Sequence, residues 1–518
     1  MSKKGSKRIR LYKDLSGKNS LIGVAARRTE NEMGLSQDTR LFLYGFIPAV
    51  VEFAGWVLDK AVESGRKRLY FLSRDGYQIY LTACKIAELK KLPIECRYLH
   101  VSRYAMRVPA YHLDLHESLD RICSGGMEVT LEIVLKRGGL TEEEAREVAD
   151  SIGRKDGYRK LLNQKQITKL KMILGHEPLF LKYVEAHSRE AYENAMGYLR
   201  QEGLLSEDSY AIVDSGWVGT FQQSLQSLVH SSAPHIHIEG YYFGLYELPP
   251  EADACDYHGW YFTPGEGLKR KVYFSNSLFE ALCSADEGMT VGYSRQGGRY
   301  LPVLDPAGNP NGEKIRRNLA VLECFLKNYG EVYALTNKVP FSANTYFRKI
   351  KKLQRGSAGS TEDRIGSVKK RFTLLMAKPS AVEMRSFGAL LFSDDVLTGN
   401  YQELAARLTK EEIRNLYIMP RLCILTGLRR GILRESAWVE GSIVRCGMCG
   451  GHGKTKARKS DAGEAMESGR EIHGTEFVDS LYIRKSLRRI RRYKYLAYGR
   501  KQLKAHLHQQ KNGKEAIV

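Results

Sequence analysis

The chain has 518 residues, with 81 Lys and Arg against 59 Asp and Glu, and a formal net charge of +22. A hydrophobic fraction of 43% excludes a wholly disordered protein, and the length suggests two to four domains. With no uncharged apolar run of about 18 residues and no apolar core behind the basic first residues, neither a membrane-spanning protein nor a secretory signal is expected. Nine scattered cysteines favour reduced thiols, so we expect a cytoplasmic protein.

The positive charge is concentrated at the two ends of the chain. Residues 1–13 contain six basic and no acidic residues, and residues 481–518 contain twelve basic residues and one acidic residue. We expect residues 1–33 to form a basic arm. In the C-terminal segment, apolar residues recur at three-residue steps, which predicts a basic amphipathic helix.

Such a C-terminal helix has several possible partners. It suits an anionic membrane surface, an acidic protein partner, or its own core, on which the apolar stripe would dock. Attachment to lipid would place the protein peripherally at the inner face of the membrane. No recognised nucleic-acid module accompanies the charge, so specific nucleic-acid binding is not expected.

In chain order, the first predicted element is a buried helix over residues 41–62, whose apolar run contains Pro48, Glu52 and Asp59. A short apolar strand, LYFL, follows at 69–72, then a polar loop, a helix and a second strand at 94–101. This order predicts a βαβ unit with parallel strands.

The same pattern returns after a helical insertion at about 104–207. A strand at 210–213, a polar loop and a helix are followed by another strand at 238–245. Two such units predict an α/β fold for residues 34–300, with a parallel Rossmann-like sheet. We expect residues 301–445 to be mainly helical and 446–518 to form a loop and the basic helical tail.

The polar loop DSGWVGT follows the strand at 210–213. Its glycines allow close approach of the backbone to a ligand, and the amides at the start of the next helix can bind phosphate. Asp214 could hold a sugar hydroxyl or Mg²⁺; alternatively, it caps the helix while the glycines form a tight turn. The candidate phosphate-binding residues of this loop are Gly216, Trp217, Gly219 and Thr220.

A second polar loop, SRDG, follows the first strand. Asp75 could act as a base, a Mg²⁺ ligand or a hydroxyl acceptor, while Arg74 could clamp a phosphate; alternatively, the two form an ion pair that shapes the turn. Since carboxyl ends of parallel strands meet at one edge, we expect both loops to line one crevice for an anionic substrate. The candidate binding residues of this loop are Ser73, Arg74 and Gly76. Ser102 and Arg103, at the end of the second strand, and Arg107 shortly after it are further candidates.

Two further patterns are open to more than one interpretation. Glu280, in the sequence NSLFE, is either a second acidic group of the crevice or an exposed helix position. Cys446, Cys449 and His452 have the spacing of half a zinc site, but the second pair of ligands is missing, which favours a loop with two free thiols over a metal site.

Together, the motifs YFLSRDGY, YLHVSR, IVDSGWVGT and NSLFE resemble a module of the haloacid dehalogenase (HAD) superfamily. The resemblance extends over roughly residues 34–442. It is similar to the C-terminal module of predicted HAD hydrolases associated with glycosyltransferases in bacterial surface-polysaccharide gene clusters. The resemblance implies a HAD-like hydrolase or a transferase that acts on phosphorylated sugars.

The chain departs from the HAD pattern at the nucleophile. HAD chemistry needs an Asp-x-Asp motif at the end of the first strand, and here Ser73 takes the place of the nucleophilic Asp. A serine there cannot form the aspartyl-phosphate intermediate. IVDSGWVGT is also similar in layout to the ribose-phosphate loop of type I phosphoribosyltransferases, with Ser215 where that family has a second acid.

From these motifs we expect an enzyme that acts on a phosphorylated sugar or nucleotide-sugar in surface-polysaccharide biosynthesis, with Asp75 and Asp214 as catalytic residues. A phosphoribosyltransferase-like transferase is one alternative. A non-catalytic nucleotide-sugar-binding or scaffold protein of a glycosyltransferase complex is another.

Overall fold

The structure is a computed structural model. It describes residues 3–17, 20–126, 128–206, 209–338, 361–393, 397, 399, 401–431, 433–448 and 478–515. Of the half zinc motif, Cys449 and His452 lie outside the described residues, while Cys446 belongs to a helix.

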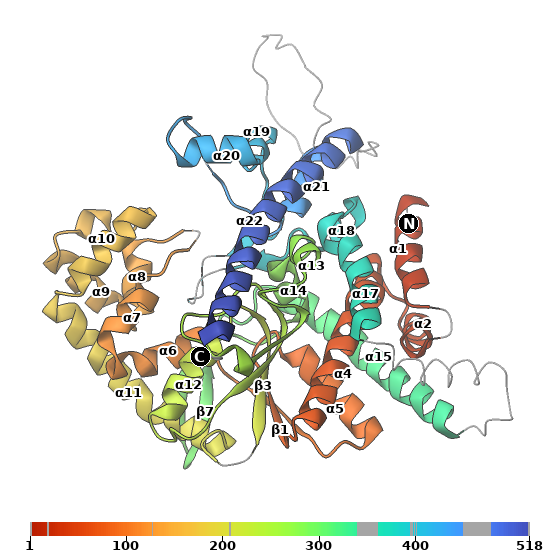
Figure 1. Ribbon diagram of the computed structural model, residues 1–518, viewed down its shortest axis with the longest axis horizontal. Helices are drawn as coiled ribbons and strands as arrows, with labels where there is room; N and C mark the ends of the chain where they lie inside the picture. Colours follow the sequence, from red (N-terminus) through yellow and green to blue (C-terminus); the bar gives the residue numbers. More distant parts are fainter. Residues whose placement is uncertain are drawn as a thin grey trace, which may run out of the picture.

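A five-stranded, all-parallel sheet forms the centre of the fold, which confirms the predicted α/β class (Figure 1). The strand order is β2-β1-β3-β4-β5. The chain therefore runs outward from β1 to β2 on one side and through β3, β4 and β5 on the other. The strands are β1 (Arg68–Leu72), β2 (Glu95–Leu99), β3 (Tyr210–Trp217), β4 (Glu239–Leu245) and β5 (Tyr257–Phe262).

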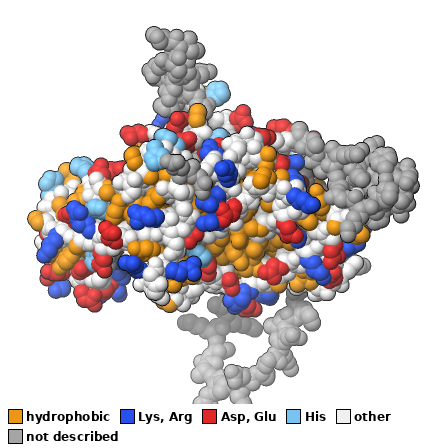
Figure 2. All heavy atoms as spheres, turned by 90° about the horizontal axis from the view of Figure 1, so that it is seen from below, with side chains coloured by type: hydrophobic (Ala, Val, Ile, Leu, Met, Phe, Trp, Pro, Cys, Tyr) orange, Lys and Arg blue, Asp and Glu red, His pale blue; other side chains and the backbone are white. Residues whose placement is uncertain are grey.

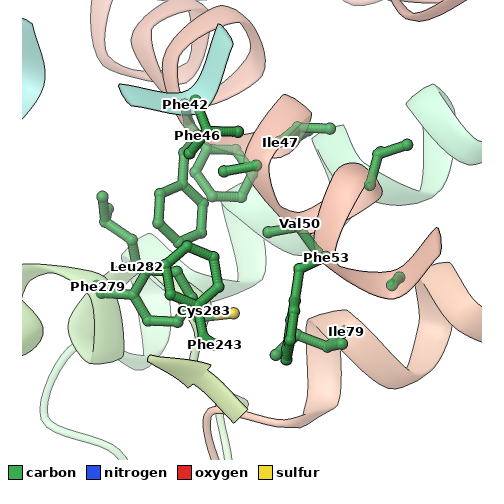
Figure 3. Packing of buried hydrophobic residues seen from close by; sticks show 14 of the residues in the cluster. Phe42, Phe46, Ile47, Val50, Phe53, Ile79, Phe243, Phe279, Leu282 and Cys283 are labelled. Atoms are coloured by element: carbon green, nitrogen blue, oxygen red, sulfur yellow. The ribbon is translucent and has the colours of Figure 1, made fainter. Parts of the chain in front are cut away.

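Both faces of the sheet are covered by helices, because the strand residues alternate between two apolar clusters. Leu69 and Phe71 of β1 pack with α4 (Ile47–Glu63) and α5 (Tyr77–Lys90). Tyr70 and Leu72 of the same strand pack in a second cluster with α11 (Pro178–Glu202) and α12 (Thr220–His230). Figure 3 shows the first cluster, in which Phe46 and Phe53 meet Phe243 and Phe279.

The predicted helix at 41–62 is confirmed as a buried core helix. It is continuous with a short helix before it, so that one helical stretch runs over Gln37–Glu63. This stretch is long and apolar enough to cross a membrane, but 89% of its most apolar window is buried inside the protein. Burial of this kind is typical of a core helix.

The elements between β2 and β3 are all helical and form a lobe beside the sheet (Figure 1). This lobe has an apolar cluster of its own. Its elements are α6 (Arg103–Arg107), a 3₁₀ turn (Val108–Leu113), α7 (Leu115–Ile122), α8 (Leu131–Arg137), α9 (Glu142–Ser151), a 3₁₀ turn (Lys155–Gly157), α10 (Gln164–Leu174) and α11 (Pro178–Glu202).

The remaining elements surround this α/β centre. Helix α12 (Thr220–His230) connects β3 to β4. Before the sheet lie α1 (Lys3–Leu15), α2 (Leu21–Met33), α3 (Gln37–Leu41) and a π-helical turn (Phe42–Phe46). Two two-stranded antiparallel sheets and a series of helices follow β5. They are α13 (Leu268–Val272), α14 (Asn276–Cys283), β6 (Thr290–Gln296), β7 (Arg299–Leu304), α15 (Gly312–Lys338), α17 (Thr361–Phe372), α18 (Ala381–Phe387), β8 (Leu391–Phe392), β9 (Gln402–Glu403), α19 (Lys410–Asn415), α20 (Ile418–Leu425), α21 (Val439–Met448) and α22 (Ser480–Glu515).

Both basic ends of the chain pack on the rest of the protein. In α1, Tyr12 is fully buried and donates a hydrogen bond to Glu383 (2.8 Å), which also pairs with Arg8. At the other end, Leu487 and Ile490 of α22 are buried in a cluster with α19 and α21 residues. The apolar stripe of the C-terminal helix is thus docked on the protein's own core.

A buried ion pair fixes the middle of α22. Lys494 Nζ lies 2.7 Å from Glu440 Oε1, and the Glu440 side chain is 2% exposed. The charge of Glu440 outweighs the burial of Lys494 and raises the pKa of that ammonium. Removing one partner of such a pair leaves the other charged and buried, which is costly.

We predict that Lys494→Met lowers the free energy of unfolding by about 3 kcal/mol, measured by urea denaturation at neutral pH. The matched control is Lys501→Met, which removes an exposed pair with Glu247 at 3.1 Å and should change stability by less than about 1 kcal/mol. Equal effects of the two substitutions would contradict a docking role for the buried pair.

Candidate functional site

A cavity of about 400 Å³ opens at the carboxyl ends of β1 and β3. The strand order reverses between these two strands, and crevices of parallel sheets form at such switch points. The lining comes from six places: the loops after β1, β2 and β3, helix α14, residues 309–311, and a later segment that contributes Leu391, Phe392, Ser393, Leu397 and Tyr401.

Of the residues predicted from the sequence, most line this one cavity. They are Ser73, Arg74, Asp75, Ser102, Arg103, Asp214, Gly216, Trp217, Gly219, Thr220 and Glu280. Gly76 and Arg107 are outside the lining.

The loop after β1 is held in shape by Ser73 and Gly76. The Ser73 hydroxyl donates a hydrogen bond to the Val101 carbonyl (2.6 Å) and accepts one from the Val101 N–H (2.9 Å), which ties the loop to the segment after β2. At Gly76, a Cβ atom would lie 2.3 Å from the Leu72 carbonyl oxygen. Gly76 therefore permits the tight turn that directs the neighbouring Arg74 and Asp75.

Asp75 and Asp214 form an electrostatically coupled pair on the adjacent strand ends. Burial raises the pKa of Asp75 despite a hydrogen bond from the Ser215 hydroxyl and the positive charges of its Arg neighbours. Burial, and then the charge of Asp75, raise the pKa of Asp214 well above its ordinary value. The pair therefore resists carrying two negative charges at once.

Strand β3 extends through Trp217, so the first four residues of the predicted loop DSGWVGT belong to the strand. Gly216, Trp217 and Gly219, at the end of β3 and in the turn after it, have φ angles of 104°, 80° and 75°. A Cβ at Gly216 would lie 2.7 Å from the Gly244 carbonyl oxygen, so this position requires glycine. The Trp217 indole N–H donates to Glu280, and these contacts set the loop so that α12 begins at Thr220 beside the cavity.

Positive charge enters the cavity from the loops after β1 and β2. Nη1 of Arg74 is buried and has no hydrogen-bond partner among the residues that the structure describes. Arg103 lines the cavity and is exposed, while Ser102 caps its helix α6 and donates to the Thr290 carbonyl (2.6 Å). The cavity thus combines two guanidinium groups with the positive end of α12.

Arg107 lies one turn beyond Arg103 on α6 and adds to this positive potential from behind. Burial, followed by the nearby charge of Arg103, lowers the pKa of Arg107 to about 10. Within the described part of the chain its Nε finds no acceptor. Arg107 therefore contributes charge to the site without lining the cavity.

The sequence interpretation missed the far wall of the cavity. Asn311 donates from Nδ2 to the Leu391 carbonyl (2.8 Å) and accepts from the Leu391 N–H (2.9 Å), so residues 309–311 and 391–393 close the crevice together. The motif Asn309-Pro310-Asn311 was the only local signal for this wall.

Glu287 was also missed and lies just outside the lining. Tyr98 donates to it at 2.6 Å, and the His100 ring lies 3.2 Å away. Burial opposes its ionisation, but these two hydrogen bonds and the charge of Arg74 outweigh it and lower the pKa of Glu287. The ionised form of Glu287, favoured in this way, balances part of the positive charge of Arg74.

The donor set offers limited capacity for a metal. Among the described residues, no group of three or more His, Cys, Asp or Glu side chains lies together. Asp75 and Asp214 are two carboxylates, which suits Mg²⁺ that takes its remaining ligands from water and substrate phosphate. A divalent cation would also relieve the repulsion that raises the pKa of both groups.

These features describe a Rossmann-like α/β protein with a crevice at its switch point that brings together two arginines and two carboxylates. No protein-family model matches the sequence, and no curated protein matches it.

The carboxylate pair has a consequence for stability. A carboxyl whose pKa is raised by folding stabilises the protein fully below the unfolded-state pKa near 3.9, and that contribution is lost as the pH rises through the raised folded-state value. We predict that Asp214→Asn is more stable than the wild type at pH 8, by roughly 1.4 kcal/mol for each unit of pKa elevation.

The measurement is urea denaturation at pH 8 and at pH 4, where the difference should shrink. Exposed Asp156, in the helical lobe, provides the control substitution Asp156→Asn, which should be neutral at both pH values. Destabilisation by Asp214→Asn at pH 8 would contradict a strained carboxylate pair.

Proposed function

We propose that this protein is an enzyme that acts on a phosphorylated sugar or nucleotide-sugar in bacterial surface-polysaccharide biosynthesis. The supporting observation is the meeting of a coupled carboxylate pair and two arginines with a helix N-terminus in one crevice. The arginines and the helix suit phosphate, and the carboxylates suit sugar hydroxyls. The biosynthetic setting rests on the resemblance to HAD-associated modules.

The binding roles follow from the charges of the site. Arg74 and Arg103 donate to phosphate oxygens from the loops after β1 and β2. The N–H groups at the start of α12 and the Thr220 hydroxyl donate to them from the end of β3. Nη1 of Arg74, which has no hydrogen-bond partner among the described residues, would donate to a phosphate oxygen.

The carboxylates carry the chemistry in this proposal. Because their charges repel, one proton is shared by the pair over a broad pH range, as in other carboxylate dyads. The ionised member accepts a proton from the attacking hydroxyl, and the protonated member can donate one to the leaving oxygen. Mg²⁺, if held by both carboxylates, would take the place of the shared proton and would neutralise charge on the phosphate and on the leaving oxygen instead.

Group transfer suits the site better than HAD-type hydrolysis. Ser73 stands at the HAD nucleophile position and cannot form the aspartyl-phosphate, and both the donor and the acceptor function of its hydroxyl are engaged with Val101. We therefore propose transfer of a glycosyl or phosphosugar group to an acceptor hydroxyl.

Ligand binding is tested first, by a thermal-shift screen of sugar phosphates, nucleotide-sugars and phosphoribosyl pyrophosphate, each with and without Mg²⁺. A ligand at 100 times its dissociation constant stabilises by about 2.7 kcal/mol, which moves the melting temperature visibly. We expect a phosphorylated sugar to give a shift that Arg103→Ala reduces, because one cavity guanidinium is lost. Arg146→Ala, on the exposed face of α9, is the control; no shift by any compound would contradict the proposal.

Turnover of the compound so identified separates an enzyme from a binding protein. We expect Asp75→Asn and Asp214→Asn each to lower kcat by at least about 100-fold, since general acid–base groups contribute 10²–10⁴-fold, while binding is largely kept. Product formation is followed by phosphorus NMR, with Asp156→Asn as control. Binding without turnover in the wild type would instead favour the scaffold alternative.

A further inference from the structure

Helix α20 exposes large apolar side chains to solvent. Met419, Leu422, Leu425 and Leu428 are 67%, 50%, 65% and 83% exposed. They follow one another at three-residue steps along the helix and the turn after it. Every residue of α20, all of which the structure describes, is exposed or half-buried. Four large apolar side chains grouped in this way are the mark of an interaction surface.

The neighbouring helix α22 places a basic face beside this apolar group. The two helices touch, since Tyr417 hydrogen-bonds to Ser486 (2.8 Å) and the Arg421 guanidinium lies 5.2 Å from the centre of the Tyr493 ring. Steps of three and four residues along α22 define one exposed face. Its members are Leu481, Lys485, Arg488, Arg492, Leu496, Arg500 and Leu503.

The charge around the apolar group is strongly positive. Residues 480–506 contain ten basic residues and no acidic one, and residues 410–435 contain six basic and three acidic residues. The three acids, Glu411, Glu412 and Glu435, each lie near an arginine, at 3.6, 3.8 and 3.2 Å. The opposite side of the molecule differs, for Figure 2 shows acidic and basic side chains interspersed there.

This combination selects one kind of partner. Exposed leucines bury no apolar area against the solvated phosphate backbone of a nucleic acid. Arginines form no ion pairs with a neutral apolar protein surface. An anionic bilayer offers both partners at once, with acidic headgroups above an apolar layer. We propose that α20, the turn after it and the outer face of α22 form a docking surface for an anionic lipid bilayer.

This surface is separate from the stripe by which α22 holds to its own protein. Leu487 and Ile490 face the core and are buried, while Leu481 and Leu496 lie on the opposite, exposed side. Docking therefore requires no rearrangement of α22. The crevice also stays intact, because none of its lining residues belongs to α20 or α22.

The experiment uses the full chain and sedimentation with vesicles of phosphatidylcholine alone or with 30% phosphatidylglycerol. We expect binding to the anionic vesicles only, weakened by high salt. The triple variant Leu422→Ser, Leu425→Ser, Leu428→Ser should bind about tenfold or more weakly. Its matched control replaces two equally exposed side chains of the helical lobe, Leu161→Ser and Met172→Ser, and should bind as the wild type does.

Several results would overturn the proposal. The first two are a wild-type protein that does not bind anionic vesicles and a triple variant that binds as well as the wild type. The third is a wild-type protein that self-associates while the triple variant does not, which would assign the surface to a second copy of the chain. Circular dichroism checks folding of the variant, and Leu428→Asp in the turn after α20 provides a second test. The readout is independent of the sugar ligand, so its failure leaves the proposed function standing.

Discussion

The structure is organised around two half-buried carboxylates at the point where the sheet reverses its strand order. Asp75 follows β1 and Asp214 lies within the adjacent strand β3, and the charge of Asp75 raises the cost of ionising Asp214. The surrounding groups reduce that cost: the Ser215 hydroxyl and backbone N–H groups donate to the pair, and Arg74 and Arg103 supply positive charge. Such strained arrangements persist where function requires them.

The sequence predicted the centre of this arrangement because its signals are local. Each apolar strand is followed directly by its polar loop and helix, so the βαβ units, both loops and their shared edge could be inferred. The strand β5 and the hairpin β6–β7 were not predicted, since aromatic and glycine residues obscure their period. The cavity wall formed by residues 309–311 and 391–393 depends on packing between two segments about 80 residues apart in the sequence. No local pattern encodes such a contact.

Single residues illustrate the same limit. Arg107 and Gly76 were placed in the binding set by proximity in sequence, yet Arg107 acts on the cavity only through its charge and Gly76 only through the turn that it permits. Glu280 was open between an exposed position and a site residue; it lines the cavity and accepts a hydrogen bond from Trp217. Side-chain direction decided the cases of Arg107 and Glu280, and a close backbone approach decided that of Gly76; spacing along the chain determines neither.

The C-terminal helix connects the proposed docking surface to the crevice through packed aromatic rings. Tyr498 of α22 stacks on Tyr246 at 5.1 Å, and Tyr246 lies 6.2 Å from the ring of Trp217, whose carbonyl accepts its N–H at 2.8 Å. Trp217 in turn holds Glu280 in the cavity wall. Direct packing therefore joins α22 to the cavity wall, although no residue of α22 lines the cavity itself.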